Sequence, residues 1–82
     1  MMVSAFSVTR GNPVRQDVLE AVRAHRGVTV AELYDLLPQH GRREIRDAVL
    51  ALNGELLRRC GTAMVPNKAG ALSRVYRWEA MA

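Results

Sequence analysis

A stripe of apolar side chains within residues 41–53 most constrains how this chain folds. Four residues follow the i, i+3, i+4, i+7 pattern of one helix face: Ile45, Ala48, Val49 and Leu52. A single helix cannot bury such a stripe by itself, so other parts of the chain must cover it. Because the chain has 82 residues, we expect one small domain with one hydrophobic core.

The segment 11–27 predicts a first helix that covers part of this stripe. Asn12 suits the N-cap, Pro13 suits the first helical position, and Gly27 ends the helix. Its apolar face is predicted to hold Val14, Val18, Ala21, Val22 and His25, with Leu19 beside it. We therefore expect His25 to be a partly buried packing residue.

The segment 28–38 predicts a second, short helix. Thr29 and Glu32 have the spacing of a capping box, in which each side chain accepts a hydrogen bond from the other residue's backbone N–H. Pro38 prevents the helix from continuing far. Its buried stripe is predicted to consist of Leu33, Leu36 and Leu37.

Residues 55–82 change from helical to strand-like patterning. The runs "LLRRC", "AMV" and "RVYRW" predict a β-hairpin of residues 56–65 and 71–79. Turn residues separate the strands: Pro66, Asn67 and Gly70. Lys68 is then near the tip of the hairpin. Cys60 lies in a predicted strand, where we expect it to pack.

These elements predict a mainly α fold with a small antiparallel β-hairpin. We expect residues 1–11 to form a loose N-terminal arm, residues 12–79 to form the domain, and residues 80–82 to be a short tail. The formal net charge of +4 and the pI of about 10.2 favour an anionic partner.

Three arginines crowd the start of the predicted third helix: Arg42, Arg43 and Arg46. The N-terminus of a helix already carries partial positive charge, so arginine is unfavourable there. At about 100° per residue, Arg43 points almost directly away from the core stripe, and Arg46 lies at its flank. Asp47 and Leu50 are also on the outer side. This arrangement favours an anionic ligand at the start of the helix.

Enzyme and metal chemistry have no support in the residue pattern. His25, His40 and Cys60 do not have the spacing of a zinc site, and the acidic residues form no evident catalytic dyad. We predict no catalytic residue, no cofactor, no metal and no small-molecule substrate. No apolar run approaches the roughly 18 residues that span a membrane. A lone cysteine forms no internal disulfide and fits a reducing, cytoplasmic location.

The order helix, helix, tight turn, helix, hairpin resembles the winged helix-turn-helix family. "VLEAVRAHRGVTVAELYDLLP" resembles the family's first helix, a short strand at 28–30, and its second helix. "RREIRDAVLALN" resembles the recognition helix, and "SRVYRWE" resembles the outer wing strand, where an aromatic residue commonly closes the core.

The resemblance implies sequence-specific binding of double-stranded DNA, as in a small transcription regulator. The recognition helix would lie in the major groove. The implied base contacts are Arg43, Arg46, Asp47 and Leu50. The implied backbone contacts are Arg42, His40, Lys68 and Arg74. Two alternatives stay open: a homodimer, which would increase specificity, and a protein-interaction module that docks a protein through the third helix, for which the exposed Leu50 would be a contact.

Overall fold

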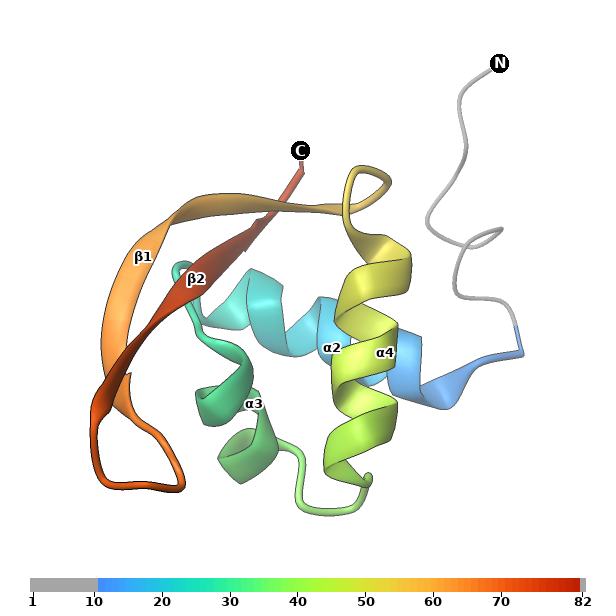
Figure 1. Cartoon of the computed structure of the whole chain (residues 1–82). Coiled ribbons are helices and arrows are strands. Elements are labelled where there is room, and N and C mark those ends of the chain that lie inside the picture. Colours follow the sequence, from blue (N-terminus) through green and yellow to red (C-terminus); the bar gives the residue numbers. More distant parts are fainter. Residues whose placement is uncertain (1–10, 82) are drawn as a thin grey trace.

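The computed structural model describes residues 11–81. All but the last residue of the predicted arm, 1–11, lie outside this range. These residues form three helices, α2 (Pro13–Ala24), α3 (Val30–Leu36) and α4 (Arg42–Leu52), followed by the strands β1 (Leu57–Pro66) and β2 (Leu72–Ala80) (Figure 1). This confirms the predicted helical part and antiparallel hairpin, although Ala80, assigned to the tail, belongs to β2.

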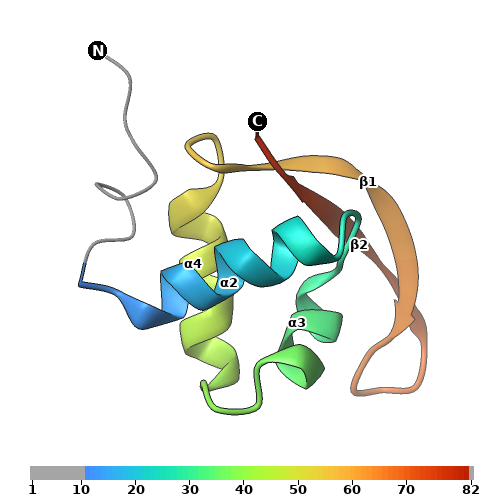
Figure 2. The ribbon, with the colours of Figure 1, turned by 180° about the vertical axis from the view of Figure 1, so that it is seen from behind.

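The three helices and the base of the hairpin share one core. Helix α2 crosses α4 on the side seen in Figure 2, while α4 faces the viewer in Figure 1. The buried apolar residues come from every element: Val18, Leu19, Val22, Val28, Leu33, Leu37, Ile45, Ala48, Val49, Leu52, Leu57 and Trp78. The apolar stripe of α4 is therefore fully covered.

Helix α2 begins as its sequence predicts but ends earlier. The side chain of Asn12 accepts a hydrogen bond from the backbone N–H of Arg15 at 3.1 Å, and Pro13 takes the first position. The prediction that His25 packs on the apolar face is wrong. His25 is the C-cap residue, with φ −129° and ψ 72°, so its side chain leaves the helical face and is exposed.

Helix α3 begins with the predicted capping box. The backbone N–H of Glu32 donates to the Thr29 hydroxyl at 3.2 Å, and the backbone N–H of Thr29 donates to the Glu32 carboxylate at 3.0 Å. Because the helix starts at Val30, the expected strand at 28–30 is reduced to one bridge between Val28 and Trp78.

The buried stripe of α3 is narrower than predicted. Leu33 and Leu37 are buried, but Leu36 is 41% exposed, which corrects the expectation that it lies in the core. Leu33 and Leu37 are four residues apart and share one face, so Leu36 falls to the side of that face. Leu36 instead lines a cleft together with His25 and Asp35.

The hairpin is antiparallel and contains a bulge. Its register pairs Arg59 with Trp78 and Gly61 with Arg77, so Cys60 has no partner between them. A bulge leaves the extra residue unpaired and bends the strand. The prediction that Cys60 packs is therefore wrong, because it is exposed at this irregularity.

Candidate nucleic-acid interface

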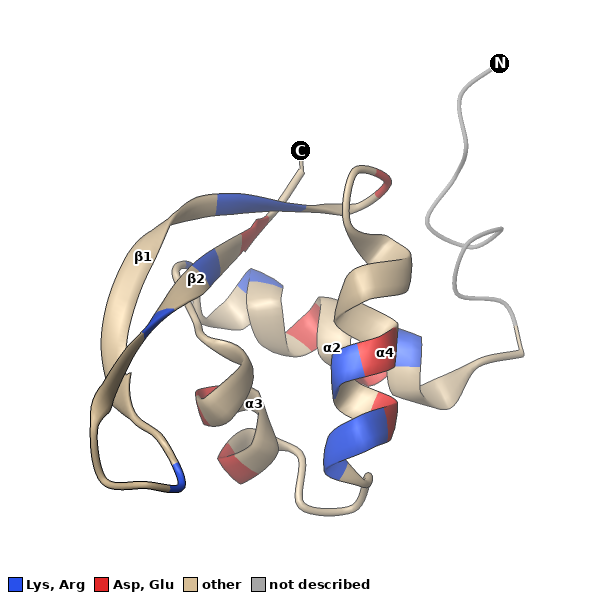
Figure 3. Cartoon of the chain, in the orientation of Figure 1, with Lys and Arg blue, Asp and Glu red and all other residues tan. Residues whose placement is uncertain are grey.

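The exposed face of helix α4 has two flanks of different charge. Its first turns carry Arg42, Arg43 and Arg46, all exposed. Figure 3 shows the blue arginine ribbon on the side of α4 nearer to α3 and the hairpin, and red on the opposite side. The N-cap residue is Gly41, which has no side chain to cap the helix. Its first N–H groups and its arginines therefore create positive potential at the same end.

The arginine flank borders an apolar groove between α4 and β2. This groove has a volume of about 290 Å³, and its lining residues are Val30, Ala31, Arg46, Val49, Leu50, Arg74, Val75, Tyr76 and Trp78. Leu50 is 56% exposed, as predicted. Arg42 lies nearer the core side, with its guanidinium 5.3 Å from the centre of the Tyr34 ring. The structure thus brings three predicted contact residues, Arg46, Leu50 and Arg74, to one groove.

The acidic flank of α4 lies apart from that groove. Glu44 and Asp47 line a separate cleft with residues 11–15 at the start of α2. Arg43 lies between the two flanks by helical geometry. Asp47, which was grouped with Arg46 and Leu50 as a base contact, therefore lines this cleft, whereas Arg46 and Leu50 line the groove.

The tip of the hairpin is held by one asparagine. The Asn67 side-chain oxygen accepts hydrogen bonds from the backbone N–H of Ala69 at 2.9 Å and of Ala71 at 3.1 Å, and its amide donates to the Ser73 hydroxyl at 2.8 Å. Lys68 lies in this turn and is exposed. The tip and the start of α4 are at the same end of the molecule in both views (Figures 1 and 2).

His40, predicted as a backbone contact, is turned toward the protein. Its Nε2 lies 2.7 Å from a carboxylate oxygen of Asp17 on α2. The His40 side chain is only 14% exposed. This contact ties the turn before α4 to the first helix, and sequence spacing gave no sign of it because the two residues are 23 positions apart.

The other hairpin arginines contact the protein itself. Arg58 and Arg59 point to opposite faces, as alternation predicts: Arg58 lies 3.4 Å from a carboxylate oxygen of the buried Glu79, and the Arg59 guanidinium lies 4.1 Å from the centre of the Tyr76 ring. Arg77 donates to the backbone oxygen of Gly27 at 3.0 Å. These three arginines help to position the hairpin.

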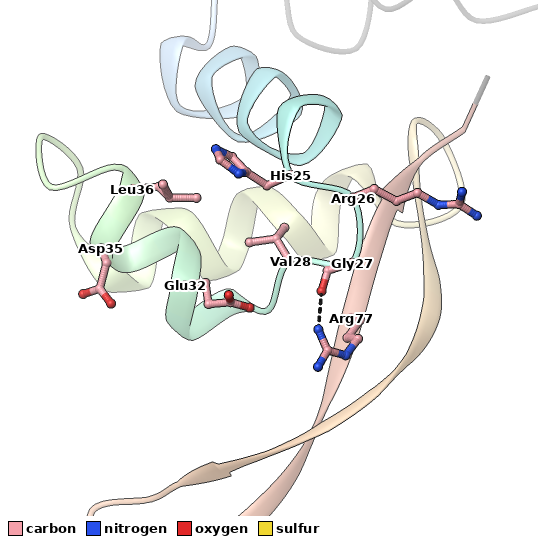
Figure 4. A pocket seen from close by; sticks show the side chains of 8 residues that line it. All are labelled: His25, Arg26, Gly27, Val28, Glu32, Asp35, Leu36 and Arg77. Atoms are coloured by element: carbon pink, nitrogen blue, oxygen red, sulfur yellow. Dashed lines mark hydrogen bonds between the residues drawn. The ribbon is translucent and has the colours of Figure 1, made fainter.

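A second, more polar cleft lies between α2, α3 and β2 (Figure 4). It has a volume of about 470 Å³, and the side chains around it include His25, Glu32, Asp35 and Arg77. The backbone hydrogen bond from Thr29 is the main cause that holds the pKa of Glu32 below its ordinary value. In residues 11–81, no group of His, Cys, Asp and Glu side chains has the arrangement of a metal site. The cleft therefore offers mixed charge and no built ligand set.

Comparisons with family models, curated proteins and solved structures found no match to this chain. No helix in the described part of the chain is long and apolar enough to span a membrane. The groove was not predicted from the sequence, although alternation along β2 places Tyr76 and Arg74 on the same face as Trp78 and would have indicated it.

Proposed function

We propose that this protein binds double-stranded DNA sequence-specifically, as a small transcription regulator with a winged helix-turn-helix fold. Helix α4 enters the major groove, and the hairpin acts as the wing. The element order, the tight turn before α4 and the buried Trp78 on β2 all support this assignment. The start of α4 and the hairpin tip lie at the same end of the molecule (Figure 1), so both could reach one duplex.

One observation carries the proposal: within the described part of the chain, the arginines at the start of α4 have no carboxylate partner. Among residues 11–81, the ion pairs join Arg26 and Arg58 to Glu79, and His40 to Asp17. Arg42, Arg43 and Arg46 take part in none of them. No ion pair within the described residues thus offsets the unfavourable interaction of these arginines with the helix dipole. DNA phosphates and guanine edges would offset it.

The experiment that tests this function is binding of duplex DNA as a function of salt. Contacts to roughly four to six phosphates give a slope of log K against log salt near −4 to −5. Fluorescence anisotropy of a labelled random duplex measures the slope. Arg43→Ala should weaken binding, while Arg23→Ala, which removes an exposed arginine from α2, is the matched control and should have little effect. Absent or salt-insensitive binding would refute the proposal.

A second function is favoured by the apolar groove beside α4. Leu50 on α4 and Tyr76 on β2 line this groove together and are 56% and 48% exposed. Apolar surface of this kind, rimmed by polar residues, is typical of protein interfaces. The chain would then be a protein-interaction module that docks a partner through the α4 face. Failure of DNA binding at low salt would leave this second function in place.

A further inference from the structure

Strand β2 has a free edge that points into the groove. The backbone N–H of Trp78 donates to the Val28 oxygen at 2.9 Å, and the Trp78 oxygen accepts from the N–H of Gly27 at 2.8 Å. Trp78 therefore directs both backbone groups away from β1. Successive residues of a strand alternate, so Tyr76 and Arg74 direct their backbone groups to this same side.

Only the base of this edge is occupied in the described structure. The segment before α3 bridges β2 antiparallel at Val28 and then turns into the helix at Val30. Beyond that bridge, the groove is lined by the start of α3, with Val30 and Ala31, and by α4 across from β2. Among the described residues, Trp78 therefore has a backbone partner on this side, whereas Tyr76 and Arg74 have none. Unpaired strand edges are templates for pairing with another chain.

The charge and polarity of the groove define the chemistry of the occupant. Arg46 and Arg74 line it, Arg59 covers the ring of Tyr76, and no acidic residue lines it in the part of the chain that the structure describes. Its remaining lining side chains are mainly apolar, and duplex DNA offers little apolar surface to cover them. An extended peptide that alternates apolar and acidic side chains would match the backbone edge, the apolar floor and the arginines together.

We propose that the free edge of β2 binds an extended acidic segment of a partner protein as an added strand. This inference rests on the second function above and names its partner chemistry. An added strand needs a spacing of about 4.8 Å from β2, whereas a helix with its side chains needs about 10–12 Å. A second copy of this chain is a poor occupant, because pairing of two β2 edges brings the arginines of β2 together.

The probe for this site is a synthetic peptide of about ten residues that alternates glutamate with valine or isoleucine. Binding should shift the fluorescence of Trp78, the single tryptophan of the chain, which lines the groove. It should also slow amide hydrogen exchange at Tyr76 and Arg74, measured by NMR. Docking through side chains alone would leave those two amides unprotected, and that result would overturn the proposal.

Two control peptides isolate the backbone and the charge. A peptide of the same sequence, N-methylated at the positions that face β2, should lose binding because it lacks the strand donors. A peptide with lysine in place of glutamate should also fail to bind. If the N-methylated peptide bound as tightly as the acidic peptide, strand addition would be excluded. If the lysine peptide bound as tightly, charge recognition would be excluded.

Matched protein variants show where the peptide binds, and parallel assays distinguish peptide binding from DNA binding. Leu50→Asp should weaken binding about tenfold or more, since it removes apolar contact and adds repulsion. Leu36→Asp changes another exposed leucine, outside the groove, and should leave binding unchanged. DNA binding without peptide binding by the folded wild type would overturn this inference and leave the DNA function intact. Peptide binding without DNA binding would support this inference alone.

Discussion

Helix α4 and the outer hairpin differ in how far their apolar side chains are buried. The apolar stripe of α4 is buried completely, from Ile45 at 0% exposure to Leu52 at 0%. The outer hairpin instead exposes Met64, Leu72 and Tyr76 at 54%, 62% and 48%. Only its base, with Leu57 and Trp78, joins the core. The difference indicates that the helices and the hairpin base supply most of the packing that stabilises the fold, while the outer hairpin supplies little of it.

The largest expected effect contrasts one leucine from each region. Leu52→Ala should lower the free energy of unfolding by about 2–5 kcal/mol, because it leaves a cavity in a closed core. Leu72→Ala makes the same chemical change at a mostly exposed site and should cost less than about 0.5 kcal/mol. Urea denaturation followed by circular dichroism measures both. Equal losses would show that the hairpin is as much a part of the core as α4.

The sequence predicted the helical region well because its signals are local. Asn12, the Thr29–Glu32 capping box and the apolar stripe of α4 each act within a few residues, and the structure confirms them. The failures occurred where a neighbour decides the outcome. His25 falls just past the end of α2, and Cys60 is displaced by a bulge that depends on the register with β2.

A second contrast, for the proposed DNA binding, is between arginines that contact bases and residues that contact the DNA backbone. Arg43→Ala or Arg46→Ala on α4 should reduce the preference for the best site over random DNA by about 1–3 kcal/mol. Arg42→Ala, and Lys68→Ala at the hairpin tip, should weaken both affinities equally and flatten the salt slope by about one unit each. Competition binding of all four variants against specific and scrambled duplexes makes this comparison. Parallel losses for Arg43 and Arg46 would make them backbone contacts.

The candidate site was only partly predictable, because its residues meet through tertiary packing. Helical angles correctly predicted that Arg43 and Leu50 are exposed. They could not show which neighbour each flank of α4 faces. That Asp47 borders the start of α2 while Arg46 borders β2 follows from how the elements pack. The free edge of β2 likewise exists only because the segment at Val28 turns into a helix.

The helix cap predicts a smaller effect with a defined pH dependence. Thr29→Ala should cost about 1 kcal/mol, because the N–H of Glu32 loses its acceptor. The pKa of Glu32 is lowered in the folded protein. Its contribution to stability is therefore present above the ordinary value of 4.5 and is lost as the pH falls through the lower, folded-state pKa. Denaturation curves at neutral pH and well below pH 4.5 should show this loss, and Glu32→Gln should reduce it. An unchanged pH dependence in Glu32→Gln would assign the loss to other carboxylates.

His40 gives an expected effect of similar size and decides to which region the turn before α4 belongs. If it acts through Asp17, His40→Ala removes one hydrogen bond and should cost about 0.5–1.5 kcal/mol of stability. Asp17→Ala should cost a similar amount, and the double variant should cost less than the sum, because the two side chains form one contact. The salt slope of DNA binding should stay unchanged, since the imidazole is mostly buried against α2. A slope flatter by about one unit with unchanged stability would instead make His40 a phosphate contact. The turn would then belong with the hairpin tip, as surface that serves binding and contributes little to the fold.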